Sequence, residues 1–349
     1  MAWNRGIPGS VVAVSAMAMM CAAAAAQGVP PNYSWNWATI GAPGNPAHYA
    51  AAFPGAPGRW VGNVDYTYRM ATTEVTGSQW LEFVRNYAQY VSNDEQANSD
   101  FTSGAIVFIG RDSQNRPQYS LAPIYENVAV GFSWRYAARY CNWLHNDKAL
   151  TRDAYERGAY DTSTFTQNPD GTYNDQATHS PGARYWIPSD NEWTKAAYYD
   201  PNKFGPGQGG YWRYPNGSDT PLVGGLPGEP GAQSSGPLPY EGPSYQSYNI
   251  PVGSYPGSNR PWGLLDTSGG ASEWTETWGW VLDGRGLGRT IRGSGTGAGE
   301  YAEYGDNINA DYFFGPNDQF GLRLASAIPS PGSMITLAAF ISTQRRRRS

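Results

Sequence analysis

Glycine and proline recur along the whole chain, and they limit how long any helix or strand can become. The 349 residues include 43 glycines and 27 prolines, both above the average share for a soluble protein. Glycine is costly inside helices and strands, and proline lacks the N–H group that both structures need. The chain also has 14 tryptophans and 25 tyrosines, too many for a chain that stays unfolded. We therefore expect short elements and many turns around a core rich in aromatic side chains.

Three segments nevertheless carry strong helix signals. Thr76–Gln79 and Ser189–Glu192 are capping boxes, which satisfy the free N–H groups of a first helical turn. A third helix is predicted over residues 133–146, and Asp200-Pro201 is expected to end the helix that starts at Ser189. Apolar side chains follow at helical spacing. They are Trp80, Phe83, Val84 and Tyr87 in the first helix, and Ala137, Tyr140, Cys141 and Leu144 in the helix over 133–146.

The rest of the chain predicts a single folded domain over residues 27–326. The segments 205–243 and 284–299 are dense in glycine, and they read as loops. No tandem repeat of fixed period and no linker between two self-sufficient cores is visible. The expected fold class is therefore α+β, with short helices, short strands and long loops.

The charge of the chain is divided between its ends and its body. Five of the 24 basic residues, Arg5 and the run Arg345–Arg348, lie in terminal segments without acidic residues. The 19 that remain face 29 acidic residues, which gives the body a net charge of −10. Such a surface repels phosphate backbones, so nucleic acid is an unfavoured partner. Hard cations and neutral ligands fit it better.

The first 26 residues read as a secretory signal peptide. Arg5 supplies a positive start, Val11–Met20 an apolar stretch, and Ala22–Ala26 a cleavage site of small residues. This pattern predicts export, with cleavage after Ala26.

Residues 327–349 read as a sorting tail. Ile328–Gly332 is rich in proline, Met334–Ile341 is mostly apolar, and Arg345–Arg348 closes the chain. The order resembles a PEP-CTERM-type sorting signal of exporting bacteria, although Ser330 stands where that motif carries glutamate. The apolar stretch is shorter than the roughly 20 residues that span a membrane. The tail therefore predicts transient membrane engagement and a surface location, and a frayed basic terminus is the alternative.

Several short motifs occur along the body in one characteristic order. Together they resemble the formylglycine-generating-enzyme, or sulfatase-modifying-factor, family, and they cover roughly Trp37 to Ser326. Each motif is weak alone, and the order is what makes them specific. The segments are Ala71–Thr76, Val130–Leu144, Arg184–Trp193, Pro251–Tyr255, Trp262–Asp266, Ala271–Glu276, Arg289–Gly293 and Phe320–Ala325.

The resemblance implies a fold, and the positions at which this sequence departs from the family pattern imply a function. The family fold is an irregular α+β relative of the C-type lectins, in agreement with the short elements expected above. Family oxidases carry two cysteines shortly after the turn that matches Arg289–Gly293, and their thiolates hold copper. By spacing from Arg292, Ala298 and Glu303 stand at those positions, and neither can bind copper(I). The resemblance therefore implies that copper and formylglycine-generating activity are absent. Cys141, the one cysteine after the leader, is expected to be inert core.

A weakened calcium site is the second implication of the resemblance. Family members use the turn that matches Ala271–Glu276, and the glutamate among its ligands maps to Glu273. Gly270 replaces an asparagine ligand here, so only backbone oxygen remains at that position. The alternative is that Glu273 is an ordinary surface or helix-end carboxylate.

Other patterns that carry chemistry are weaker. Glu273 and Glu276 could meet on one face of a turn as a hydrolase pair, but solvated acids are the favoured interpretation. The three histidines, His48, His145 and His179, are scattered without metal-ligand spacing. The glycine-rich run 293–299 lacks the lysine of a phosphate loop and reads as a flexible loop.

Aromatic residues in the loops are the remaining functional hint. They could stack on sugars or protein partners, although core packing is favoured for any one of them. We therefore expect a protein that binds an unidentified protein or carbohydrate ligand, and an enzyme that uses the same cleft is the alternative. The residues are Trp35, Trp37, Tyr211, Trp212, Tyr214, Trp278 and Trp280.

Overall fold

The computed structural model describes most of the predicted domain. The described residues are 30–50, 58–91, 93, 105–228, 232–233, 250–256, 261–280, 287–295, 308–309 and 312–328. Val29–Pro329 forms one compact unit. The predicted leader, most of the predicted tail, and Ala298 and Glu303 lie outside the described residues.

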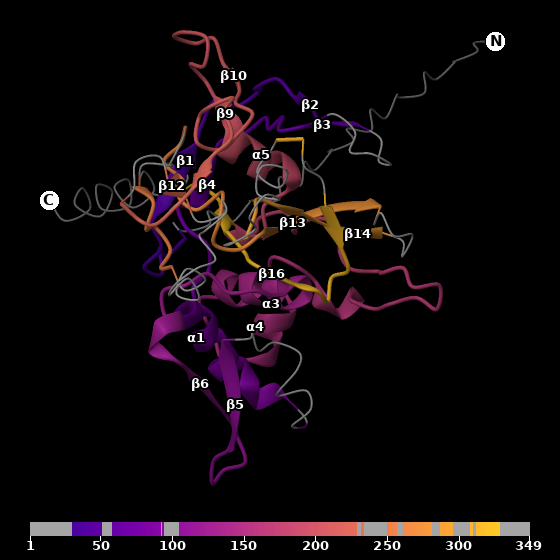
Figure 1. Cartoon of the computed structure of the whole chain (residues 1–349). Coiled ribbons are helices and arrows are strands. Elements are labelled where there is room, and N and C mark those ends of the chain that lie inside the picture. The colour runs from indigo at the N-terminus through magenta and orange to yellow at the C-terminus, as the bar shows by residue number, and fades with distance from the viewer. Residues whose placement is uncertain are drawn as a thin grey trace, which may run out of the picture. The chain divides into compact units, whose positions relative to one another are not determined.

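Short helices and short strands alternate along this unit, as the glycine and proline content predicts (Figure 1). The α+β expectation is confirmed. The helices are α1 (Gly77–Tyr87), α3 (Trp134–His145), α4 (Arg152–Glu156) and α5 (Asp190–Tyr198), with single 3₁₀ turns at Ala88–Tyr90, Pro123–Tyr125 and Thr162–Thr164. The strands are β1 (Trp37–Ile40), β2 (His48–Ala50), β3 (Arg59–Val61), β4 (Tyr68–Ala71), β5 (Ile106–Arg111), β6 (Pro117–Leu121), β7 (Phe132–Ser133), β8 (Tyr185–Trp186), β9 (Tyr199–Asp200), β10 (Gly210–Tyr211), β11 (Val223–Gly224), β12 (Ala232–Gln233), β13 (Glu273–Trp280), β14 (Leu287–Arg292), β15 (Tyr312–Phe314), β16 (Gln319–Phe320) and β17 (Ala325–Ser326).

The three long helices begin where the sequence predicts. Both capping boxes form: in α1 the Thr76 hydroxyl accepts from the Gln79 N–H, and the Gln79 side chain accepts from the Thr76 N–H. Ser189 caps α5 in the same way. This helix ends at Tyr198, slightly before the predicted stop, because Tyr199 and Asp200 pair with β10. The helix α4 carried no sequence signal that we recognised.

The domain has two larger sheets, and the first of them joins its two ends. The first has the strand order β1-β4-β17-β8, and its β17 pairs antiparallel with both β4 and β8. The second has the order β13-β14-β15. Other strands pair in twos, among them the β2–β3 and β5–β6 hairpins. Since β17 lies between β4, near the start of the domain, and β8, the end of the domain completes the sheet that its beginning starts.

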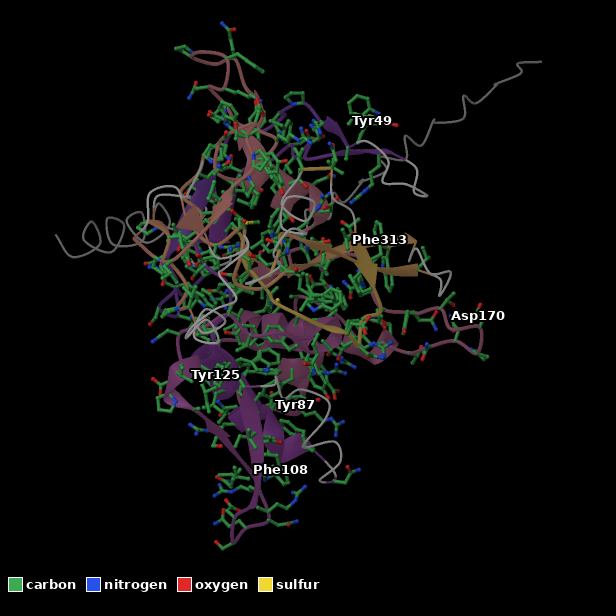
Figure 2. All side chains as sticks on the ribbon, viewed as in Figure 1. Tyr49, Tyr87, Phe108, Tyr125, Asp170 and Phe313 are labelled. Atoms are coloured by element: carbon green, nitrogen blue, oxygen red, sulfur yellow. The ribbon has the colours of Figure 1, made fainter. Side chains whose placement is uncertain are left out.

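Aromatic side chains dominate the core between α1 and α3. Trp80 of α1 stacks on Phe132, and Phe83 packs against Trp143 of α3. Cys141 lies on the buried face of α3 with 0% of its surface exposed, as expected. Tyr87, at the end of α1 and labelled in Figure 2, stacks on Phe83 of the same group of rings. Among the described residues, no helix is long and apolar enough to cross a membrane.

Candidate functional site

Strand β13 carries the acidic residues on which the sequence analysis focused. The pairing of β13 with β14 is irregular between Trp274 and Trp278, so regular alternation does not place these side chains. Their contacts do: Glu273 and Glu276 meet different partners. Both are buried, with 1% and 2% of their surfaces exposed. The interpretation of these residues as solvated or surface acids is therefore wrong, and they do not form a carboxylate pair.

Glu273 forms a buried ion pair with Arg323. The Arg323 Nη2 donates to Glu273 Oε1 at 2.7 Å, and Arg323 Nε lies 3.1 Å from both carboxylate oxygens. Trp193 of α5 donates its indole N–H to Glu273 Oε2 at 2.6 Å. Arg323 also donates to the backbone carbonyls of Ala71 and Thr72. The pair therefore ties β13, α5 and the end of β4 to the C-terminal part of the domain.

Two further acids lie beside this ion pair. Glu74 is fully buried; its Oε2 lies 3.7 Å from Arg323 Nη2, and its Oε1 accepts from the Ala271 N–H. Burial and the nearby charge of Asp266 raise the pKa of Glu74 well above its usual value. Burial likewise raises the pKa of Asp266. Both shifts favour the neutral carboxyl form, which lowers the negative charge around a single guanidinium.

This arrangement does not fit a calcium ion on Glu273. Both of its oxygens face Arg323, and a bound cation would stand next to the guanidinium without the charge of another free carboxylate. At Gly270, an added Cβ would lie 2.0 Å from Glu74 Oε1, so any side chain there requires Glu74 to move. Among the described residues, no group of three or more His, Cys, Asp or Glu is placed to hold a metal ion.

A second buried ion pair joins α5 to β14 and β3. Asp190, the first residue of α5, accepts from Arg292 Nη2 at 3.0 Å and from Arg59 Nη1 at 2.6 Å. Burial alone would raise the pKa of Asp190, but the charges of Arg292 and Arg59 outweigh it and hold that pKa below its usual value. Asp190 is therefore a charged anchor between three elements. Figure 1 shows α5 beside β13 and β14 at this place.

His179 and Glu276 form the third cluster. The His179 Nδ1 lies 3.1 Å from both oxygens of Glu276, and the His179 backbone N–H donates to Oε2 at 2.9 Å. Tyr160 donates its hydroxyl to the same Oε2 at 3.0 Å. The imidazole stacks on Trp186, with ring centroids 4.5 Å apart. Its side chain keeps 23% of its surface exposed, whereas that of Glu276 keeps 3%.

Arg289 of β14 fixes the loop that carries His179. Its guanidinium lies between the rings of Trp134 and Trp278, 3.5 Å and 3.9 Å from their centroids. It donates to the backbone carbonyls of Gln176 and Ala177, in the segment that leads to the histidine. Burial lowers the pKa of Arg289 to about 9. A buried cation, which has little contact with water, thus holds the loop in place.

The His179 cluster favours the protonated form of its imidazole. Burial alone would lower the pKa of His179, but the hydrogen bond and charge of Glu276, with a smaller contribution from Glu192, raise it above the usual value. Glu192 itself accepts from the indole of Trp186 and from the Tyr66 hydroxyl. Burial lowers the pKa values of the other two histidines, His48 and His145. Of the three histidines, His179 is therefore the one suited to hold a proton and to donate it, since its side chain remains partly exposed.

Protonation of His179 should stabilise the fold. Because its folded pKa is raised, this contribution is fully present below the unfolded pKa of about 6.5 and disappears as pH rises through the folded value. His179→Gln keeps a donor for Glu276 but cannot carry charge, and we expect it to cost about 1 kcal/mol at low pH. Urea unfolding of both proteins across this range measures the effect. Parallel pH profiles for wild type and His179→Gln would contradict it.

The sequence analysis found some members of these clusters and missed others. Glu273 was singled out, but its partner Arg323 lies 50 residues away. His179 was dismissed as scattered, and it meets Glu276 across 97 residues. Among the loop aromatics, Trp35 and Tyr214 are buried core, whereas Trp37, Tyr211, Trp212 and Trp278 are partly buried.

Comparisons with known proteins add the family. The sequence model of the sulfatase-modifying factor enzyme 1-like domain (FGE-sulfatase) matches residues 61–328. Among solved structures, the chain is similar to one titled "Crystal Structure of CarF", with 16% identity and a TM-score of 0.47. That similarity covers 84% of this chain and 98% of the other. No curated protein matches the sequence.

Proposed function

The chain belongs to the sulfatase-modifying factor enzyme 1-like family, and from this premise we propose that it is an exported binding protein without formylglycine-generating activity. The resemblance to family oxidases implies a pair of copper-binding cysteines after the Arg289–Gly293 turn. Ala298 and Glu303 stand at those positions, and neither side chain offers the soft sulfur that copper(I) requires.

The environment of Cys141 is the observation that carries the proposal. It is the one cysteine within residues 61–328. It lies on the buried face of α3, and burial raises the pKa of its thiol well above the usual value. A reactive or metal-binding cysteine needs a thiolate and access to solvent. Cys141 has neither, so the matched domain lacks a usable thiol.

Thiol reactivity tests this proposal directly. In the Cys21→Ser protein, we expect no reaction with a disulfide reagent such as DTNB while the protein is folded. After unfolding in guanidinium chloride, one thiol should react, which serves as the internal control. Reaction of one thiol in the folded protein at the rate of a free cysteine would contradict the assignment of Cys141 as core.

The buried ion pairs support a binding role. In the Glu273–Arg323 and Asp190–Arg292 pairs, the two side chains of each pair bind each other. Both arginines also donate to backbone carbonyls, and in this way the pairs hold loops in place. A rigid scaffold that holds surface loops in fixed positions suits ligand binding. The body charge of −10 favours neutral ligands, carbohydrate or protein, over nucleic acid. Calcium on Glu273 is not part of this proposal, because the Arg323 ion pair does not accommodate it.

The alternative function is an enzyme that uses the same cleft, either a formylglycine-generating-type oxidoreductase or another activity. The His179–Glu276–Tyr160 cluster favours the second form, because a histidine held by a buried carboxylate is a general acid–base arrangement. An activity that His179→Gln abolishes without loss of stability at high pH would favour this alternative.

Export is part of the proposal and rests on the ends of the chain. Arg5, Val11–Met20 and Ala22–Ala26 together have the form of a cleaved leader, and the tail over residues 327–349 resembles a PEP-CTERM-type sorting signal. We expect N-terminal sequencing of the protein from its native envelope to begin near Gln27 or Gly28. An intact Met1 on the envelope protein would overturn this localisation.

A further inference from the structure

The β2–β3 hairpin presents two aromatic rings to solvent on one face. Tyr49 and Trp60 stand directly opposite each other in the antiparallel register. Their ring centroids lie 5.2 Å apart with an interplanar angle of 60°. Tyr49 has 51% and Trp60 68% of its surface exposed. Figure 2 shows Tyr49 standing away from the hairpin. We refer to this pair as the aromatic platform.

The opposite face of the hairpin is anchored to the rest of the domain. Val61 is buried, and His48 Nε2 lies 3.1 Å from Asn309 Oδ1. The ion pair between Arg59 and Asp190 connects β3 to the start of α5. The Gly62 N–H donates to the Asn191 side chain at 2.9 Å, one residue further along α5. The platform is therefore preorganised, and a ligand would not have to order it.

Gly58 lies against the Tyr49 ring of the aromatic platform. A Cβ at this position would lie 2.4 Å from the Tyr49 hydroxyl oxygen and 2.7 Å from the ring carbon that bears it. The tyrosine ring therefore lies across the backbone of Gly58, where any side chain would displace it. Because Gly58 has no side chain, Tyr49 can lie at its observed angle to Trp60.

We propose that the aromatic platform is a stacking site for a neutral saccharide built from β-linked glucose-like rings. Such a ring has equatorial hydroxyls, so each face is a flat patch of C–H groups that fits an exposed indole. This inference rests on the proposed binding function and names its ligand class and its residues.

Area and charge favour a saccharide over other occupants. A stable protein partner needs about 800 Å² on each side, whereas two partly exposed rings offer only a few hundred. The neighbouring cation, Arg59, has its guanidinium engaged with Asp190, so the site is not built for an anionic ligand. The negative charge of the body also favours a neutral ligand.

Calorimetric titration of the exported protein with cellopentaose tests the inference. We expect saturable binding that Trp60→Ala weakens by about tenfold or more. Gly58→Ala should also weaken binding, because it moves Tyr49 without removing a ring. Ile109→Ala is the matched control, since Ile109 is 62% exposed on the other hairpin, β5–β6, and its loss should leave affinity unchanged. Equal melting temperatures confirm that the variants are folded.

Two results would overturn the inference. Absence of cellopentaose binding by the wild-type protein would exclude this ligand class. Equal binding by wild type and Trp60→Ala would show that the saccharide binds elsewhere. Neither result bears on the absence of oxidase chemistry, which is measured separately by the conversion of a cysteine peptide.

Discussion

Arg323→Met is expected to lower the free energy of unfolding by about 3–5 kcal/mol, because it leaves the buried charge of Glu273 without its partner. The nearest ionisable neighbours, Glu74 and Asp266, are themselves acids, so they cannot replace the lost positive charge. The variant also removes the hydrogen bonds to the carbonyls of Ala71 and Thr72. Urea unfolding followed by tryptophan fluorescence measures the loss.

A surface ion pair provides the control for this prediction. Arg152 and Glu156 lie four residues apart on α4, with 67% and 37% of their side chains exposed. Such pairs contribute only about 0.3–0.5 kcal/mol, so Arg152→Met should change stability little. The double variant Arg323→Met with Glu273→Met leaves no lone charge from the pair and should recover part of the loss. Equal effects of Arg323→Met and Arg152→Met would contradict the structural role of the buried pair.

Local signals in the sequence predicted the three long helices well. Thr76 and Ser189 were recognised because a capping box acts within four residues, and both boxes form. Cys141 was assigned to the core from its helical spacing, and it is fully buried. The motif order predicted the family, and the family sequence model matches residues 61–328. These features depend on neighbours in the chain or on order along it.

Contacts between distant residues were beyond the same reasoning. Acidic residues are seldom fully buried, so Glu273 and Glu276 read as solvated until their partners are known. The partners, Arg323 and His179, reach them only through the folding of β13 against other elements. The exposed pair on β2–β3 was missed for the opposite reason, because three-residue strands carry too little periodicity to show which face is outside.

Absence of cysteine oxidation is the second large effect that we expect. A family oxidase needs two thiolates to hold copper, and the one thiol of the matched domain is buried on α3. Without those ligands, we expect no preorganised copper site that could activate oxygen. The expected difference from an active family member is therefore complete loss of turnover and not a reduced rate.

The most direct measurement is the mass of a sulfatase-type peptide that contains the target cysteine. The peptide is incubated with the purified protein, copper(I) and oxygen, and a parallel reaction contains a chelator for copper. An active formylglycine-generating enzyme serves as the positive control. We predict that this protein gives no formylglycine-containing peptide in either reaction. Conversion of the cysteine to formylglycine, above the level of the chelator reaction, would contradict the account.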